Sequence, residues 1–154
     1  MDNFEIGKQC FLEGLKQLQS SNFEGAIAEF KKSLAAVPGR ISTLVNLSAA
    51  LIQNKQFSEA EEVLKDLGDI DQHIADLWLN LGLISKGRGN LQKALNHFNK
   101  ALEIDPGMAD AHLNKAFALQ ELGKYDAALS SLDQSIIIAG QSAAAYNCKG
   151  QICS

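Results

Sequence analysis

The sequence predicts an all-α protein built from four pairs of antiparallel helices, followed by part of a fifth pair. Two observations predict this class: a pattern of residues that recurs every 34 positions, and a helical spacing of apolar residues within each recurrence. An alanine marks the period without exception, at Ala26, Ala60, Ala94 and Ala128. A period of this length is typical of arrays in which each repeat is one small helical unit stacked on the next.

When the repeats are aligned on these alanines, other positions also recur with the same period. A large apolar side chain lies four residues after each alanine, and another lies three residues before it. The first column holds Phe30, Leu64, Phe98 and Leu132, and the second holds Phe23, Phe57, Leu91 and Tyr125. The repeats therefore divide into units 7–40, 41–74, 75–108 and 109–142, with a partial fifth unit at 143–154. Together they are predicted to form a single domain, 1–154.

The third unit shows the two helices most clearly. Apolar residues recur at intervals of three and four from Leu77 to about Lys86, which predicts an amphipathic helix. The segment KGRGN then breaks the pattern, and a second helical pattern runs from Leu91 to about Ile104. Pro106 ends this second helix, because proline disfavours helical backbone at the residue before it and lacks an amide hydrogen.

A column of small residues lies twelve positions before each alanine of the period. It holds Gly14, Ser48, Gly82 and Ala116. Small side chains at these positions allow the backbones of paired helices to approach closely, where a larger side chain would overpack the contact. We therefore expect Gly82 and Ala94 to lie where the two helices of the third unit meet.

These residues resemble the tetratricopeptide repeat pattern, in WxxLG from Trp78, in AxxxF from Ala94 and in Pro106, with the correct period. The resemblance covers about nine-tenths of the chain. It implies a right-handed α-solenoid in which the first helix of every unit lines a concave groove. Ser85 stands where the pattern has tyrosine, and Gln72 and Gly140 stand where units two and four would have the closing proline.

The fifth unit begins and then stops. Tyr146 and Gly150 fall in the expected columns, but the chain ends at Ser154 before a second helix. Its segment AAAYNCKGQIC carries core-type residues, which favours a fragment of a longer array over a short protein whose last helix is a cap. In either case the apolar end, with isoleucines at 136–138, is a candidate for self-association.

One asparagine per unit recurs in the first helices, at Asn46, Asn80 and Asn114. On a helical wheel they point away from the partner helix, toward the predicted groove. First helices 9–10 Å apart would place one carboxamide at about every third residue of an extended peptide, which rises ~3.3 Å per residue. A carboxamide can pair with both groups of a peptide backbone. The alternative is that these asparagines bond between adjacent first helices or are inherited by duplication without a ligand.

The asparagine column also resembles the ladder in the repeat region of O-linked N-acetylglucosamine transferases, where asparagines along the inner surface hold a peptide main chain. Leu12 in unit one and Cys148 in unit five depart from it. The predicted groove combines the three asparagines with apolar neighbours and one lysine at the rim. It comprises Asn46, Asn80, Asn114, Val45, Leu79, Leu83, Lys86, Leu113 and Phe117. Alternatively, curvature of the array buries the apolar members against neighbouring first helices.

Some members of the family clamp the terminal carboxylate of acidic chaperone tails with lysines, arginines and asparagines. The corresponding positions here hold Phe11, Leu15, Asp76 and Asn80. Because most of these residues cannot bind a carboxylate, the sequence disfavours chaperone-tail binding.

Composition excludes several other functions. The net charge of −4 argues against nucleic-acid binding, and no apolar run reaches the roughly 20 residues of a membrane span. Cys10, Cys148 and Cys153 are odd in number and lack CxxC spacing, so we expect free thiols in a reducing cytoplasm. No catalytic constellation, cofactor motif or metal-ligand spacing is present.

The sequence thus predicts a noncatalytic protein–protein interaction scaffold that binds a peptide or protein segment in its groove. Two alternatives stay open. The chain could be the substrate-recruiting arm of a larger enzyme such as a glycosyltransferase, or a self-assembly module joined through its C-terminal end.

Overall fold

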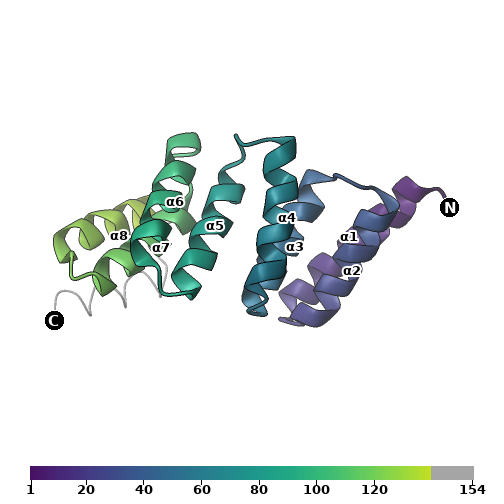
Figure 1. Cartoon of the computed structure of the whole chain (residues 1–154), viewed down its shortest axis with the longest axis horizontal. Coiled ribbons are helices and arrows are strands. Elements are labelled where there is room, and N and C mark those ends of the chain that lie inside the picture. Colours follow the sequence, from purple (N-terminus) through teal and green to yellow (C-terminus); the bar gives the residue numbers. More distant parts are fainter. Residues whose placement is uncertain (140–154) are drawn as a thin grey trace. The chain divides into compact units, whose positions relative to one another are not determined.

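The structure, a computed structural model, describes residues 1–139, and this part of the chain consists of eight α-helices without a β-strand. The all-α prediction is confirmed. The predicted fifth unit at 143–154 lies outside the described residues. The helices are α1 (Asn3–Gln19), α2 (Phe23–Ala36), α3 (Ile41–Gln53), α4 (Phe57–Ile70), α5 (Ala75–Gly87), α6 (Leu91–Ile104), α7 (Ala109–Glu121) and α8 (Tyr125–Ala139) (Figure 1).

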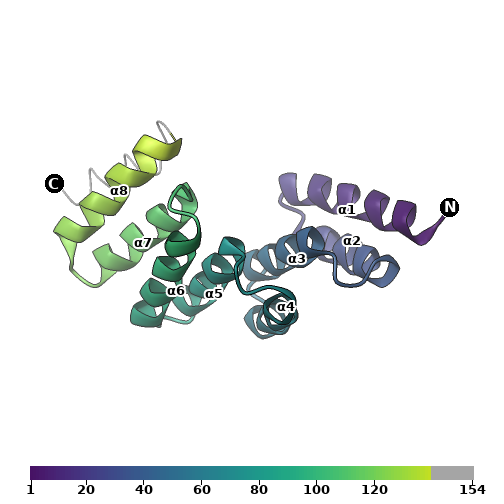
Figure 2. The ribbon, with the colours of Figure 1, turned by 90° about the horizontal axis from the view of Figure 1, so that it is seen from above.

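The chain divides into two compact units, Met1–Gln72 and His73–Ser154. In the first unit α1 packs on α2, α2 on α3 and α3 on α4, and α1 also contacts α3. In the second unit α5, α6, α7 and α8 follow the same order, with a contact between α5 and α7 (Figures 1 and 2). First helices of neighbouring repeats therefore contact each other within each unit. The prediction of a single domain stays a prediction.

Helix starts agree closely with the repeat boundaries. The predicted first residues of units two to four, Ile41, Ala75 and Ala109, are the first residues of α3, α5 and α7. Helix α1 begins earlier than the repeat, because Asp2 caps it: its carboxylate accepts a hydrogen bond from the amide of Glu5 at 2.8 Å.

The small residues of the repeat lie where paired helices approach most closely. A Cβ added to Gly14 would lie 2.5 Å from a ring carbon of Phe30, and a Cβ on Gly82 would collide in the same way with Phe98. Both phenylalanines are fully buried. The predicted close approach at Gly82 and Ala94 is confirmed, because Ala94 belongs to the same buried cluster as Phe98.

A buried hydroxyl ties the end of the second helix to the start of the first in two of the repeats. Ser33 donates to the carbonyl of Gly7 at 2.8 Å, and Ser135 donates to the carbonyl of Ala109 at 3.1 Å. Since a buried hydroxyl without a partner is costly, each bond fixes how the two helices of its pair are aligned.

The turn between the two helices of each repeat contains one residue with left-handed backbone. These residues again stand 34 apart. They are Ser21 (φ 58°), Lys55 (φ 60°), Gly89 (φ 80°) and Gly123 (φ 78°). The left-handed conformation is cheap only for glycine, so the two turns of the first unit carry backbone strain that those of the second unit avoid.

Candidate functional surface

The structure places the predicted groove residues on first helices of both units. Val45 and Asn46 lie on α3 of the first unit, and the other seven lie on α5 and α7 of the second. Two of the nine, Leu79 and Asn80, are buried, with exposed fractions of 7 % and 4 %. The partly exposed members are Val45, Asn46, Leu83, Lys86, Leu113, Asn114 and Phe117.

Burial of Leu79 has a clear cause within the second unit. Its side chain belongs to an apolar cluster with Ala94, Leu95 and Phe98 of α6, which continues to Ala111 of α7. The helical wheel predicted the direction of the Leu79 side chain but not how much of it the neighbouring helices bury. Leu79 and Asn80 therefore present little surface to a ligand.

The two partly exposed asparagines share one local geometry. The Nδ2 of Asn46 donates to the carbonyl of Ser42 at 2.8 Å, and the Nδ2 of Asn114 donates to the carbonyl of Asp110 at 2.9 Å. In both cases the acceptor lies four residues earlier on the same helix. This bond holds the carboxamide in one orientation.

Asn114 is also joined to the neighbouring first helix. Lys86 of α5 donates from Nζ to Asn114 Oδ1 at 3.2 Å, and the same Nζ lies 5.0 Å from the centre of the Phe117 ring. A cation over an aromatic face is attracted to it. These contacts join α5 and α7 into one patch, which we call the α5–α7 surface: Leu83, Lys86, Leu113, Asn114 and Phe117.

The apolar side chains of the α5–α7 surface pack against buried core residues. Leu83 packs against the cluster around Phe98, and Leu113 and Phe117 pack against Ala116 and Leu132. Each is partly exposed, so the surface offers apolar area on a rigid base beside an oriented carboxamide. Patches of this composition are typical of protein interaction surfaces.

A serine–histidine contact that sequence spacing did not reveal lies inside the third repeat. Ser85 Oγ is 3.5 Å from Nδ1 of His97, whose ring lies beside that of Trp78, tilted by 45° at a centroid distance of 6.0 Å. However, Ser85 is 7 % exposed and donates its proton to the carbonyl of Leu81 at 3.1 Å. Burial lowers the pKa of His97, so the neutral ring is favoured. The contact packs α5 against α6 and does not expose a nucleophile.

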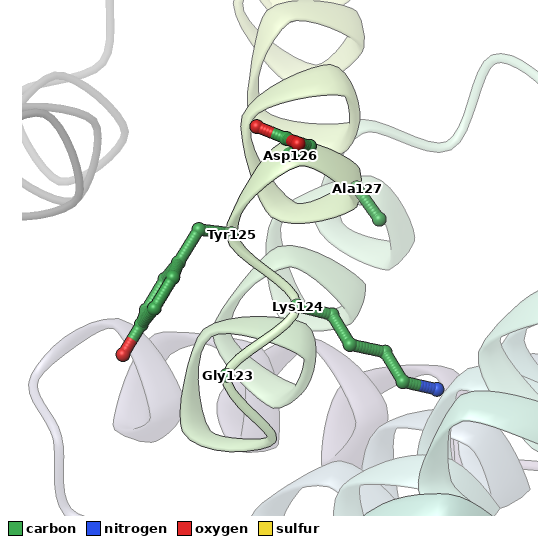
Figure 3. A pocket seen from close by; sticks show the side chains of 5 residues that line it. All are labelled: Gly123, Lys124, Tyr125, Asp126 and Ala127. Carbon is green, nitrogen blue, oxygen red and sulfur yellow. The ribbon is translucent and has the colours of Figure 1, made fainter.

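An open depression of about 450 Å³ lies at the turn between α7 and α8. Among residues 1–139 its lining is one run of five, 123–127, and Figure 3 shows the side chains of Lys124 and Tyr125 pointing in different directions. Because no polar groups of the described part of the chain converge there, those residues do not build a small-molecule site.

Within residues 1–139 no group of three or more His, Cys, Asp or Glu side chains is placed to hold a metal ion. In the same range, no helix has both the length and the apolar character needed to cross a membrane.

Comparison with known proteins decides the family. A family model described as tetratricopeptide repeat matches residues 17–81 and 87–152. The chain belongs to the tetratricopeptide repeat family. Its structure is similar to the crystal structure of MamA (25 % identity, TM-score 0.70, 96 % of this chain and 81 % of that one). It is also similar to TTC0263, a thermophilic protein of the family from Thermus thermophilus (18 % identity, TM-score 0.84, 95 % and 80 %). The predicted α-solenoid fold class is confirmed.

Curated relatives are mostly much longer than this chain. Protein FlbA of Caulobacter vibrioides is 28 % identical over 132 residues, which is 86 % of this chain and 21 % of FlbA. The human protein O-mannosyl-transferase TMTC3 is 30 % identical over 115 residues, which is 73 % of this chain and 12 % of TMTC3. An uncharacterized protein of Methanocaldococcus jannaschii is 41 % identical over 61 residues, which is 38 % of this chain and 71 % of that protein. This chain thus spans about a fifth of FlbA and an eighth of TMTC3.

Proposed function

We propose that the chain is a noncatalytic scaffold that holds an extended segment of a partner protein on the α5–α7 surface. The tetratricopeptide repeat fold supports a protein-interaction scaffold in general. The observation that carries the finer proposal is the arrangement of Lys86, Asn114 and Phe117, which places an oriented carboxamide beside partly exposed apolar side chains. In this proposal the scaffold works without cofactor, nucleic acid or membrane.

The carboxamide of Asn114 has capacity left for a ligand. An asparagine side chain has two N–H donors and two acceptor lone pairs. One donor is used on Asp110 and one lone pair on Lys86, at 2.9 and 3.2 Å. The remaining donor and acceptor match the C=O and N–H of one peptide unit, so they can hold a backbone whatever its side chains are.

The apolar neighbours would select side chains. Leu83, Leu113 and Phe117 can contact apolar residues of the bound segment, and the cation of Lys86 favours an acid beside them. In the first unit, Val45 and Asn46 on α3 stand in the same repeat columns as Leu113 and Asn114. Asn46 makes the same bond to the carbonyl four residues before it. The buried Leu79 and Asn80 would support the surface from beneath.

The test begins with selection of binding peptides from a random phage-displayed library, using the full chain as bait. Affinities of the selected peptides are then measured by fluorescence anisotropy. We expect Asn114→Ala and Phe117→Ala each to weaken binding at least tenfold. Asn96→Ala, which removes an exposed asparagine from α6, should leave the affinity unchanged. Equal effects of Asn114→Ala and Asn96→Ala would remove the proposal.

A second candidate makes the chain the substrate-recruiting arm of a larger enzyme such as a glycosyltransferase. The match to 12 % of TMTC3, whose name is that of a mannosyl-transferase, favours it. The mass of the native protein, measured by immunoblot of cells that express it, distinguishes the two: a band near 16.6 kDa excludes the larger enzyme.

A third candidate is self-association through α8. Its side chains Ile137 and Ile138 are 73 % and 40 % exposed. Sedimentation velocity at several concentrations should then show a dimer that Ile137→Glu abolishes. The control Ile104→Glu changes a 37 % exposed isoleucine of α6 and should not affect assembly.

We place the scaffold in the cytoplasm in this proposal. The support is that Cys10 is a free thiol, which a reducing compartment preserves.

A further inference from the structure

Arg40, just before α3 in the first unit, holds its cation against two aromatic rings of α1. Its guanidinium carbon lies 5.0 Å from the centre of the Phe11 ring and 5.9 Å from that of Phe4. One terminal nitrogen, Nη1, is buried and has no hydrogen-bond partner, although the residue as a whole is partly exposed. Arg40 is therefore fixed in place while part of its hydrogen-bonding capacity is unused.

This arrangement is costly for the isolated chain. A guanidinium has five N–H donors and stays charged at any physiological pH. Attraction to aromatic faces offsets part of the desolvation, but it does not replace a hydrogen bond to the buried N–H groups. A carboxylate would satisfy them, because its two oxygens match the two parallel donors of an arginine edge.

Lys8 on α1 supplies a second positive charge for an anionic ligand of Arg40. Asp2, at the start of this helix, uses its carboxylate to cap α1. Lys8 stands four residues after Phe4 and three before Phe11, so it lies on the same face of α1 and adds a second, exposed positive charge. Arg40 therefore lies against an aromatic face of α1 to which Lys8 adds a positive charge, while the acidic Asp2 and Glu5 stand in the cap and first turn of the same helix.

We propose that Arg40, Phe4, Phe11 and Lys8 form a binding site for the carboxylate of an acidic residue in a peptide segment of a partner protein. Phe4 is 60 % exposed and lies in the first turn of α1, so its ring can shift when a ligand approaches the guanidinium. The carboxylate then bridges the guanidinium edge and stands near Lys8. An apolar neighbour of the acidic residue contacts the exposed Phe4 ring and Ile41, which is 40 % exposed.

A peptide fits this site better than a nucleic acid or a membrane. Two positive charges next to exposed apolar side chains match one carboxylate and an apolar neighbour, whereas a phosphate backbone or anionic bilayer needs an extended basic face. The site lies in the first unit, so it stands or fails independently of the α5–α7 surface.

The experiment uses ¹⁵N NMR of the full chain, which has only two arginines, Arg40 and Arg88. The Nε–H signals of the two side chains are assigned with Arg88→Gln. The probe is a pool of capped heptapeptides with a central glutamate between apolar residues, and the matched pool carries glutamine instead. We expect the glutamate pool to shift the Arg40 signal in a saturable manner at least tenfold below the concentration that the glutamine pool requires. The Arg88 signal should stay in place.

Variants separate recognition from folding. Arg40→Gln should abolish the response, measured by the backbone amide of Ile41, and Arg40→Lys should weaken it at least fivefold, because lysine keeps the charge but lacks the planar fork. Arg88→Gln makes the same change in net charge as Arg40→Gln and should bind as the unchanged chain does. Thermal unfolding of all variants shows whether a loss of peptide binding comes from loss of folding. If Arg40→Gln does not fold, the affinity of Arg40→Lys tests the proposal instead.

Four results would overturn the inference. The two pools could bind equally, the Arg88 signal could move as much as that of Arg40, or no saturable shift could appear up to about 5 mM peptide, a concentration that exceeds even weak specific affinities. In the fourth, the Arg40 signal would change on dilution without peptide, and the occupant would be a second copy of this chain.

Discussion

The two compact units share one pattern of packing between paired helices, but they differ in the residues of their turns. In each unit the first helix pair joins a glycine to a phenylalanine, and the second pair joins a slightly larger residue to a leucine. The contacts are Gly14 with Phe30 in the first unit, and Gly82 with Phe98 and Ala116 with Leu132 in the second; Ser48 and Leu64 hold the same two columns in the second repeat. In the second repeat of each unit the small residue is larger than glycine and leucine replaces phenylalanine. The summed side-chain volume of the two positions therefore stays nearly the same.

The turns do not share this regularity. At the left-handed position the first unit has Ser21 and Lys55, whereas the second unit has Gly89 and Gly123. Paired helices thus adopt the same hairpin whether or not the left-handed turn residue is glycine. We infer that packing between the helices determines the hairpin structure, and that the turn residue changes only its stability.

The largest expected effect comes from breaking the packing rule at Gly82. Gly82→Ala places a Cβ within collision distance of the Phe98 ring, which is fully buried and cannot move without displacing α6. We expect a loss of about 2–3 kcal/mol in the free energy of unfolding, measured by urea denaturation. The double variant Gly82→Ala, Phe98→Leu copies the fourth repeat and should recover more than half of the loss.

Gly107→Ala is the matched control, because its Cβ would meet only an ordinary contact, 3.4 Å from a carboxylate oxygen of Asp105. It should change stability by less than about 0.5 kcal/mol. If the double variant is no more stable than Gly82→Ala alone, glycine and phenylalanine do not compensate each other and the packing rule is wrong.

A smaller effect is expected from exchanging the turn residues. Gly89→Ala meets no atom within 4 Å, so its cost is that of left-handed backbone less the smaller gain from restricting the unfolded chain, a net loss of about 1 kcal/mol. Lys55→Gly relieves the same strain but adds freedom to the unfolded chain, so we expect a net gain of about 0.5 kcal/mol. Thermal unfolding of both variants measures the difference. Changes of the same sign in both would show that the left-handed position does not control turn stability.

The sequence predicted the skeleton of each unit better than its surface. Repeat columns located the starts of α3, α5 and α7, and they predicted the close contact at Gly82, because helix pairing depends on residues that recur. They left open whether neighbouring helices bury the apolar groove residues, as they bury Leu79, because a helical wheel gives the direction of a side chain but not its exposure. The alternative that the asparagines bond between adjacent first helices is met at Asn114, which accepts from Lys86 of α5, but the sequence could not name this partner because the two side chains lie 28 residues apart on separate helices.

The smallest expected effect concerns charge, in which the units also differ. Asp76 in the second unit occupies the column of Lys8 in the first. Burial raises the pKa of Asp76, and the carboxylates of Asp105 and Asp110 raise it further. Because the folded protein holds this proton more tightly than the unfolded chain, the carboxyl group costs stability as pH rises above about 3.8 and through its raised pKa.

Asp76→Asn should therefore stabilise the protein at pH 7 by less than about 1 kcal/mol, since the site is partly exposed. The gain should vanish below pH 3.8, where the aspartate is neutral in both states. Urea denaturation at about pH 3 and pH 7, on either side of the titration, measures both limits. The first unit supplies the control: Lys8→Gln, which removes an exposed charge from the same column, should not reproduce this pH dependence. A gain of equal size at both pH values would show that the amide acts through packing and that the acidic residues of the second unit do not repel one another.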